Sequence, residues 1–175
     1  MGYDIYSESD QYAGHNAPLY QSPSDPQQNG SLDYSIKVLT ELGIPAFKIS
    51  MGIPFYCNQY SFKGADLWQS CGLGKRACSR VMMSYGYNGL QRDISNNPNK
   101  WEEKFDQDAR APYYVNTNGS SFVSCDTAAS TVEKVQFAIR NSLAGVFTWE
   151  ISNDWMGAKL HPLVDAMNAA LFRTR

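Results

Sequence analysis

Features that mark nucleic-acid-binding and membrane proteins are missing from this sequence. Lysine and arginine, 15 in total against 17 aspartates and glutamates, form no run, and the formal net charge is −2. Phosphate-rich partners are held by clustered basic side chains, so a nucleic acid is not expected to bind. The longest apolar stretches, such as residues 143–149, fall far short of the roughly 20 residues that span a bilayer, so no membrane is expected either.

Signals of export, metal binding and cofactor binding are also scarce. The chain opens on Met1-Gly-Tyr-Asp, which is polar from its second residue, so we expect no signal peptide here. The four cysteines form no C-x-x-C pair, and both histidines, His15 and His161, lie far from them in the sequence. We therefore expect neither a metal site nor a cofactor. A Cys71–Cys78 disulfide and buried free thiols both remain open.

The sequence alternates between short apolar runs typical of buried strands and segments whose apolar residues have helical spacing. Helices are predicted where apolar residues recur every three or four positions, and strands where short runs are continuously apolar or rich in β-formers. The predicted strands cover residues 1–6, 48–56 and 144–150. The predicted helices cover residues 32–42, capped by Ser31, residues 131–142, capped by Ser130, and residues 161–171. Strands that alternate with helices form a parallel sheet, so the fold class is α/β.

Residues 57–130 interrupt this alternation and are rich in glycine, serine, asparagine and aromatic residues. A loop of this length without structure is rare in a compact domain, so we expect an inserted subdomain or a partly mobile segment. Short strands are predicted at Trp68, 82–87 and 111–123, and a helical turn at 100–105. The chain is therefore expected to divide into residues 1–56, 57–130 and 131–175.

Four motifs follow one another along the chain, each at the end of a predicted strand or in the loop after it. They read Met1-Gly-Tyr-Asp, Gly14-His-Asn-Ala-Pro-Leu, Gly52-Ile-Pro-Phe-Tyr and Gly145-Val-Phe-Thr-Trp-Glu. Together they resemble the glycoside hydrolases of family 18, especially the secreted fungal-type chitinases. The resemblance implies an α/β fold that is part of a TIM (β/α)8 barrel, comprising strands six to eight and their helices. It also implies an α+β insertion between the seventh strand and its helix.

A substrate and a set of binding residues also follow from the resemblance. The family acts on chitin, a polymer of N-acetylglucosamine, so chitin or chitooligosaccharides are the expected partners and an extracellular location is expected from the family alone. Tyr3 matches a tyrosine that hydrogen-bonds the sugar's acetamido group, and Asp4 matches the neighbouring aspartate that contacts the same sugar. Trp149 matches the apolar floor beneath the sugar, and Tyr56 matches a cleft tyrosine. All four lie near the carboxyl ends of predicted parallel strands, where barrel active sites form. Without the resemblance, Trp149 is read as a core residue, Asp4 as a loop cap and Tyr3 as ordinary strand packing.

No catalytic residue is assigned in this chain. The family's acid lies in a D-x-x-D-x-D-x-E motif that occurs nowhere in this sequence, so we expect the chain to be cut off downstream of that motif. Glu150 is expected to point away from Trp149, because neighbouring side chains in a strand face opposite ways. Asp106, Asp108 and Asp126 are expected to be turn or surface residues.

Two further departures from the family pattern lie near the predicted site. Cys57-Asn58 stands where many members have Gly-Arg, and Ser124-Cys125-Asp126 replaces S-Y-D. Three hypotheses follow: part of the sugar-binding cleft of a hydrolase, a non-hydrolytic chitin-binding protein, or an inactive truncated product. Since a three-stranded piece leaves sheet edges unpaired, we also expect self-association, completion by a missing N-terminal half of the barrel, or low stability of the chain alone.

Overall fold

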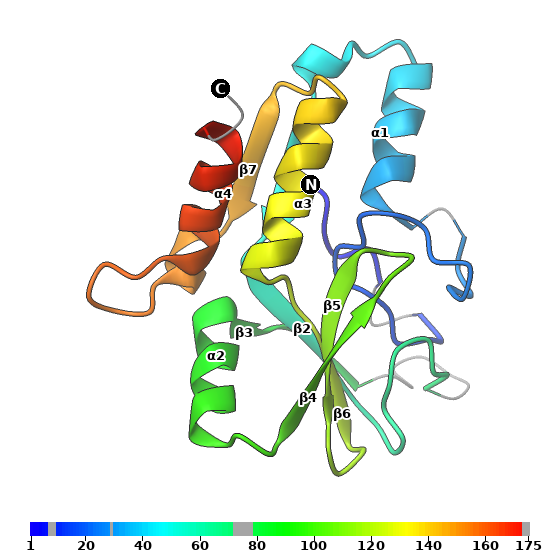
Figure 1. Ribbon diagram of the computed structural model, residues 1–175. Coiled ribbons are helices and arrows are strands. Elements are labelled where there is room, and N and C mark those ends of the chain that lie inside the picture. Colours follow the sequence, from blue (N-terminus) through cyan, green and yellow to red (C-terminus); the bar gives the residue numbers. More distant parts are fainter. Residues whose placement is uncertain (7–9, 29, 72–78, 173–175) are drawn as a thin grey trace.

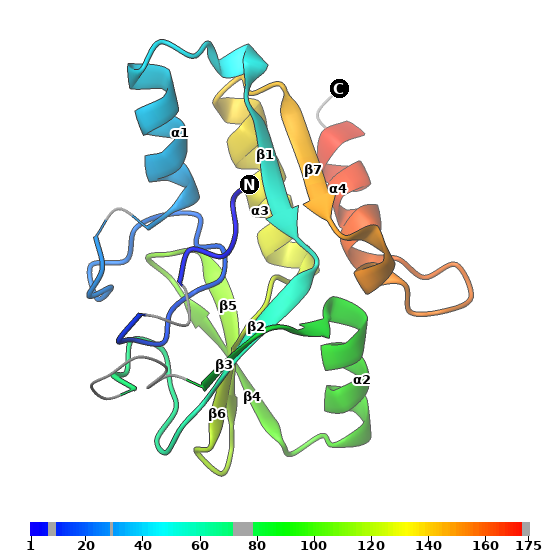
Figure 2. The same cartoon turned by 180° about the vertical axis from the view of Figure 1, so that it is seen from behind.

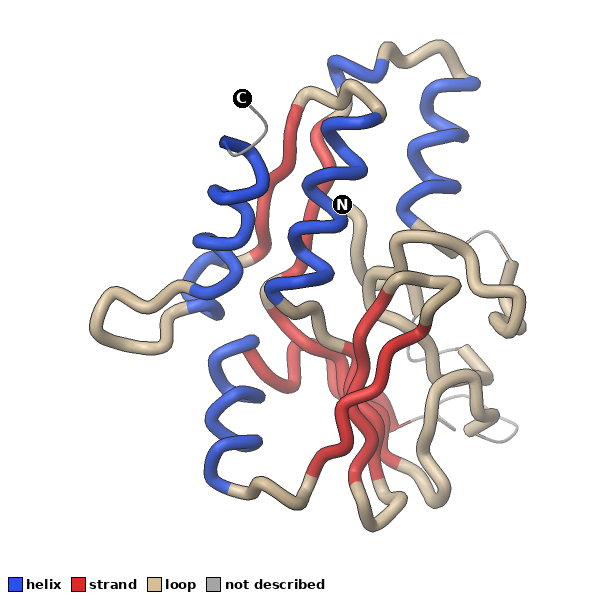
Figure 3. The backbone as a smooth tube through the Cα atoms, viewed as in Figure 1, coloured by secondary structure: helices blue, strands red, loops and turns tan. Residues whose placement is uncertain are grey.

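The computed structural model describes residues 1–6, 10–28, 30–71 and 79–172, with the side chains of residues 79–84 left out. The strands form two sheets: a parallel pair that lies among the helices and, below it in Figure 1, a five-stranded antiparallel sheet. Figure 3 shows the same division by colour, with most strand residues gathered in the lower part of the molecule.

The parallel pair consists of β1 (Ser50–Pro54) and β7 (Gly145–Trp149), which are paired in register along their whole length. Helices α3 (Ala128–Arg140) and α4 (Pro162–Phe172) lie behind this pair in Figure 2. Apolar side chains from the strands and both helices form one core between the layers; they include Met51, Ile53, Val135, Ala138 and Leu163. The predicted strand at 144–150 and the last predicted helix are confirmed. The strand predicted at 48–56 is confirmed over Ser50–Pro54, but Tyr56 begins a strand of the other sheet.

Helix α1 (Leu32–Glu41) begins where the sequence predicts. Ser31 is its N-cap, because the serine Oγ accepts a hydrogen bond from the backbone N–H of Tyr34 at 3.2 Å. After the helix the chain turns through Gly43 at φ +86°, a conformation that favours glycine. The short 3-10 turn η1 (Ala46–Lys48) then leads into β1.

The prediction for α3 was wrong at its start. The helix begins at Ala128, and its N-cap is Thr127 rather than Ser130. The Thr127 Oγ1 accepts from the Ser130 N–H at 3.3 Å, and the Ser130 Oγ accepts from the Thr127 N–H at 2.9 Å. This reciprocal capping box satisfies two backbone donors and places Ser130 inside the first turn.

The segment that interrupts the alternation contains the antiparallel sheet, whose strand order is β3-β2-β6-β5-β4. The strands are β2 (Tyr56–Ser61), β3 (Ser79–Gly86), β4 (Trp101–Asp106), β5 (Ala111–Asn116) and β6 (Ser121–Ser124), and α2 (Tyr87–Asn96) follows β3. The strands predicted at 82–87 and 111–123 are confirmed.

Two predictions within this segment were wrong, and one helix was not predicted. Residues 100–105 form most of β4, which pairs with β5 from Trp101–Asn116 to Asp106–Ala111, so cross-strand pairing overrides the local helical pattern. Trp68 lies in a loop at φ +62° instead of in a strand. Helix α2 was not predicted, because its sequence contains glycine and asparagine, which are poor helix formers.

The strand predicted at residues 1–6 does not form. Asp4 has φ +58°, a left-handed conformation that does not occur in an extended strand. A strand therefore cannot continue through Asp4. The segment still lies beside β1, since a Cβ placed on Gly2 would be 2.8 Å from the backbone oxygen of Gly52. The described residues therefore contain two parallel strands where three were expected.

Asp126 was expected at a turn or on the surface, and this prediction was wrong. Its carboxylate is buried and accepts from the Lys134 Nζ at 2.7 and 2.5 Å, with Lys134 fully buried on α3. Ser130 also donates its hydroxyl to Asp126 at 2.7 Å. Burial lowers the pKa of the Lys134 ammonium group, and the Asp126 carboxylate opposes that shift.

Asp106 is also more enclosed than predicted, whereas Asp108 is exposed in a turn as expected. The Asp106 Oδ2 lies 3.4 Å from the Nε2 of His15, a fully buried imidazole that contacts the rings of Trp68 and Tyr113 edge-on. Burial lowers the pKa of His15, and the hydrogen bond to Asp106 acts in the opposite direction. The neutral imidazole is therefore favoured in the folded chain.

The structure pairs Cys57 with Cys125 in a disulfide, which the sequence did not predict. This bond joins the start of β2 to the residue that follows β6. The predicted Cys71–Cys78 pairing involves Cys78, which lies outside the described residues. Free thiols were the other possibility, and the described part of the chain contains none.

The described residues contain no helix that is both long and apolar enough to cross a membrane. They also contain no group of three or more histidine, cysteine or acidic side chains that could hold a metal ion.

Removing one partner of the buried Asp126–Lys134 pair should destabilise the fold strongly. We expect Lys134→Ala to lower the free energy of unfolding by about 3–5 kcal/mol, because an uncompensated carboxylate stays buried. Lys37→Ala is the matched control, since Lys37 forms an exposed pair with Glu41 and should lose less than about 0.5 kcal/mol. Urea unfolding of both variants measures the difference, and equal losses would contradict the assigned burial.

His15 should make stability depend on pH. Its folded pKa lies below the unfolded value of about 6.5, so the unfolded chain binds the extra proton and stability falls as the pH drops below about 6.5. We expect His15→Gln to flatten this dependence between about pH 5 and 7, where the limiting slope for one group is about 1.4 kcal/mol per pH unit. Urea unfolding at several pH values provides the test, and parallel curves for the two proteins would contradict it.

Candidate functional site

A cavity of about 200 Å³ lies at the carboxyl ends of β1 and β7. The structure brings all four residues predicted for binding together there. The lining residues are Met1, Tyr3, Asp4, Tyr56 and Trp149. Met1, Tyr3 and Asp4 come from the chain segment beside β1, Tyr56 is the first residue of β2, and Trp149 is the last residue of β7.

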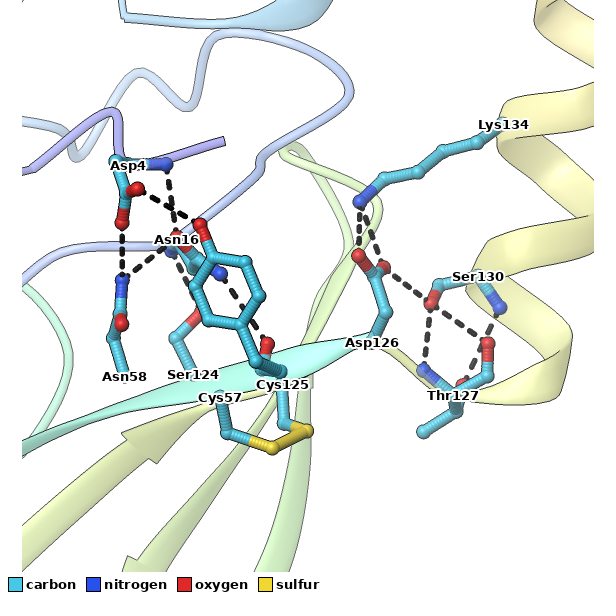
Figure 4. A network of polar contacts seen from close by, with 11 residues as sticks. Asp4, Asn16, Cys57, Asn58, Ser124, Cys125, Asp126, Thr127, Ser130 and Lys134 are labelled. Atoms are coloured by element: carbon cyan, nitrogen blue, oxygen red, sulfur yellow. Dashed lines mark hydrogen bonds and ion pairs between the residues drawn. A yellow bond between two sulfur atoms is a disulfide. The ribbon is translucent and has the colours of Figure 1, made fainter. Parts of the chain in front are cut away.

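Asp4 is the most constrained residue of the cavity. Its Oδ2 accepts from the hydroxyl of Tyr56 at 2.8 Å, and its Oδ1 accepts from the Asn58 side-chain amide at 3.1 Å. Both donors lie on β2, and Figure 4 shows the Asn58 side chain pointing toward the Asp4 carboxylate. Hydrogen bonds to a charged acceptor are stronger than neutral ones, so β2 fixes the direction of the Asp4 carboxylate.

Asn16 completes this arrangement, and the sequence did not single it out. Its Oδ1 accepts from the backbone N–H of Asp4 at 2.9 Å and from the Asn58 amide at 2.7 Å. Its own backbone N–H donates to the Ser124 Oγ at 2.8 Å. Asn16 is part of the Gly14-His-Asn motif, but nothing in that motif indicates that its side chain binds the backbone of Asp4, twelve residues earlier.

The left-handed backbone of Asp4 is explained by these contacts. Aspartate and asparagine enter this region more readily than most residues, and here the Asn16 side chain holds the Asp4 N–H in place. The outcome is a tight turn that aims the carboxylate at β2 rather than along the chain.

Tyr3 and Tyr56 meet edge to face, with ring centroids 5.8 Å apart and an interplanar angle of 76°. Burial raises the pKa of the Tyr3 phenol, and the neighbouring Asp4 carboxylate raises it further. Tyr3 therefore remains a hydrogen-bond donor at neutral pH. Gly52 permits its approach, because a Cβ at that position would come within 2.9 Å of the Tyr3 ring and 2.8 Å of the Phe147 ring.

Trp149 is 51% exposed and is not a core residue. It pairs with Pro54 in the parallel ladder, and its carbonyl accepts from the Phe55 N–H at 2.8 Å, so its backbone is fixed while the indole faces solvent. Glu150, the next residue, is exposed, accepts from the Ser152 hydroxyl at 2.6 Å and does not line the cavity.

The cavity combines an exposed indole, a protonated phenol and an oriented carboxylate. Such a set suits a ligand with a flat apolar face and polar groups at its rim, because the indole packs on the face while the polar side chains fix its orientation.

Comparisons with known proteins agree on one family. The profile of the glycosyl hydrolases family 18 matches residues 1–154. The chain is 32% identical over 162 residues to a probable chitinase 2 of Drosophila melanogaster, covering 88% of this chain and 33% of that protein. The chain therefore spans about a third of that relative's length.

Solved structures show the same likeness. The Ostrinia furnacalis Group IV chitinase in complex with allosamidin superposes with a TM-score of 0.80 at 26% identity, over 99% of this chain and 49% of that chain. Human YKL-39, described as a pseudo-chitinase with retained chitooligosaccharide binding properties, shares the fold with a TM-score of 0.78 at 23% identity. That match covers 98% of this chain and 49% of the other.

The bond between Tyr56 and Asp4 can be measured by a double-mutant cycle. We expect Tyr56→Phe and Asp4→Asn to couple by about 1 kcal/mol in the free energy of unfolding, because each removes one end of the same charge-assisted hydrogen bond. Tyr34→Phe combined with Asp4→Asn is the control, since Tyr34 is exposed on α1 and should show no coupling. Additive losses for the Tyr56 pair would mean that the bond does not form in solution.

Proposed function

The chain belongs to the glycosyl hydrolases family 18, and from this premise we propose that its cavity binds a sugar unit of chitin or of a chitooligosaccharide. The observation that carries the proposal is the convergence of Tyr3, Asp4, Tyr56 and Trp149 on one cavity. On this proposal, the cavity is part of a larger sugar-binding cleft.

Each side chain has a physical task in this proposal. The Trp149 indole offers a flat apolar surface to the C–H face of the sugar ring. The Tyr3 hydroxyl stays protonated and donates to the acetamido oxygen, and the Asp4 carboxylate accepts from the acetamido N–H. Tyr56 acts through Asp4, because its hydroxyl already donates to that carboxylate.

We propose binding without assigning a catalytic residue. The acid-bearing D-x-x-D-x-D-x-E motif of the family does not occur in this sequence, and Asp4 is held by Tyr56 and Asn58 in another role. Glu150 lies outside the cavity and hydrogen-bonds to Ser152. Hydrolysis by these residues alone is therefore not part of the proposal.

The second candidate function is a dedicated chitin-binding protein that does not hydrolyse. The observation that favours it is Asn58, a neutral amide bonded to Asp4 where a family arginine is common. Human YKL-39, described as a pseudo-chitinase with retained chitooligosaccharide binding properties, shares the fold and is in keeping with this candidate. Both candidates predict binding at the same cavity, and they differ only in whether further chain supplies the acid.

We further propose that β1 and β7 correspond to strands seven and eight of a (β/α)8 barrel, with residues 1–6 at the position of strand six. Residues 57–130 would then be the insertion, and residues 1–56 and 131–175 the barrel parts. A groove of about 320 Å³ between β7 and α4, with an apolar lining that includes Val146, Phe147 and Leu171, supports completion by further chain or by a second copy. The Cys57–Cys125 disulfide supports an extracellular location, and the fungal-type resemblance stays a sequence prediction.

Chitin binding should depend on Trp149. We expect Trp149→Ala to weaken retention on chitin beads about tenfold, equivalent to about 1.4 kcal/mol, because the stacking surface is lost. Trp155→Ala is a closely matched control: Trp155 is 54% exposed against 51% for Trp149, but it does not line the cavity.

Equal retention of the parent chain and Trp149→Ala would contradict sugar binding at this cavity. Incubation of the same preparations with chitooligosaccharides should release no new reducing ends above background. Turnover that disappears when Asp4 is replaced by asparagine would show that the chain hydrolyses with its own carboxylate, contrary to the proposal.

A further inference from the structure

The β5–β6 hairpin carries a short motif that has no part in the cavity. Its tip reads Asn118-Gly119-Ser120, between the last residue of β5 and the first residue of β6. The triplet has the form N-x-S, which the enzymes of N-linked glycosylation accept when it lies on a surface loop. Both Asn118 and Ser120 are exposed, and the hairpin tip lies at the bottom of Figure 1, far from the helices α1, α3 and α4.

The tip holds the Asn118 side chain in one orientation. Its Oδ1 accepts from the backbone N–H of Ser120 at 2.9 Å, and its backbone N–H donates to the Asn116 Oδ1 at 3.1 Å. Among the described residues, none accepts a hydrogen bond from the Asn118 Nδ2. The Oδ1 of Asn118 is therefore held by a hydrogen bond, while its Nδ2 has no hydrogen-bond acceptor among the described residues.

The turn is held by backbone hydrogen bonds on one side, and the space beside Gly119 is unoccupied. The Gly119 carbonyl accepts from the N–H groups of Gly64 and Ala65 at 2.8 and 3.2 Å, which ties the tip to the loop after β2. Gly119 has φ +69°, and a Cβ built there would meet no atom within 4 Å. The space beside Gly119 is therefore open, and its neighbours Asn118 and Ser120 are both exposed.

We propose that Asn118 is a site of N-linked glycosylation. The Asn118 Nδ2 attacks the anomeric carbon of an oligosaccharide carried on a lipid pyrophosphate, so an N–C bond forms and the C–O bond to the pyrophosphate breaks. The lipid pyrophosphate is the leaving group, and the amide nitrogen gives up one proton to the transferase. The Ser120 hydroxyl is the second group that the transferase reads.

Turn chemistry alone explains only part of the motif. Asn-Gly is a favoured pair at the tip of a hairpin, which accounts for Asn118 and Gly119 but not for a hydroxyl two residues after the asparagine. The Cys57–Cys125 disulfide agrees with the compartment that this modification requires, because disulfides persist where secreted proteins mature.

The glycan should not interfere with the cavity. Ser124, at the other end of β6, bonds to Asn16 in the network that holds Asp4, and the strand from Ser121 to Ser124 spans roughly 10 Å. The attached sugar would therefore project from the end of the antiparallel sheet that lies away from Trp149.

The test uses the full chain, fused to a cleavable signal peptide and secreted from a eukaryotic host that glycosylates. Peptide mapping by mass spectrometry, with and without peptide N-glycosidase, should show a glycan on the peptide that contains Asn118 and an aspartate at that position after enzyme treatment. Asn118→Gln and Ser120→Ala should each abolish that glycopeptide, and Ser120→Thr should retain it.

A second N-x-S triplet, at residues 29–31, is the internal control, so Asn29→Gln is made in parallel and should leave the Asn118 glycopeptide unchanged. Secreted, folded protein with an unmodified Asn118 would overturn the proposal, as would a glycopeptide that persists in Ser120→Ala. If Asn118→Gln is not secreted, the Ser120→Ala and Ser120→Thr pair still decides the question.

Discussion

The arrangement of the candidate site depends on one covalent bond, the disulfide between Cys57 and Cys125. Cys57 lies on β2 between Tyr56 and Asn58, the two residues that hold the Asp4 carboxylate. The residues that flank Cys125 connect to the loop that carries Asn16 and to the buried lysine of α3. The disulfide, together with the pairing of β2 with β6, therefore links the strand that carries Tyr56 and Asn58 to the segment that leads into α3, and Figure 4 shows this bond beside the network around Asp4.

The sequence predicted the parts of the fold that local pattern determines. Helix α1 has a serine cap and an apolar face, and β1 and β7 are short apolar runs, so both signals are contained within a dozen residues. Strand-end placement and family resemblance pointed to the same four positions, and the structure brings these residues to one cavity, although residues 1–6 form no strand. Tyr3 and Trp149 line the same cavity although they lie near opposite ends of the sequence.

Contacts between distant residues were missed for a physical reason. The partners in the Cys57–Cys125 and Asp106–His15 pairs are separated by 68 and 91 positions, and no local signal identifies either partner. Asp126 and Lys134 are only eight apart, but their burial depends on how α3 packs. Because charged residues are usually exposed, the sequence alone predicted that Asp126 lies on the surface, whereas it is buried. Local propensity also hid β4, which forms by pairing with β5, and α2, whose sequence contains the poor helix formers glycine and asparagine.

The closeness of Cys57 and Cys125 has a consequence for how such a chain can change over evolutionary time. Their Cα atoms are 4.4 Å apart, so the polypeptide leaves the antiparallel sheet almost where it entered. The entropic cost of bringing two such points together rises only slowly with the number of residues between them. The sheet can therefore gain or lose a hairpin without altering the register of β1 with β7, and lineages can remodel one wall of the cavity while inheriting the rest unchanged.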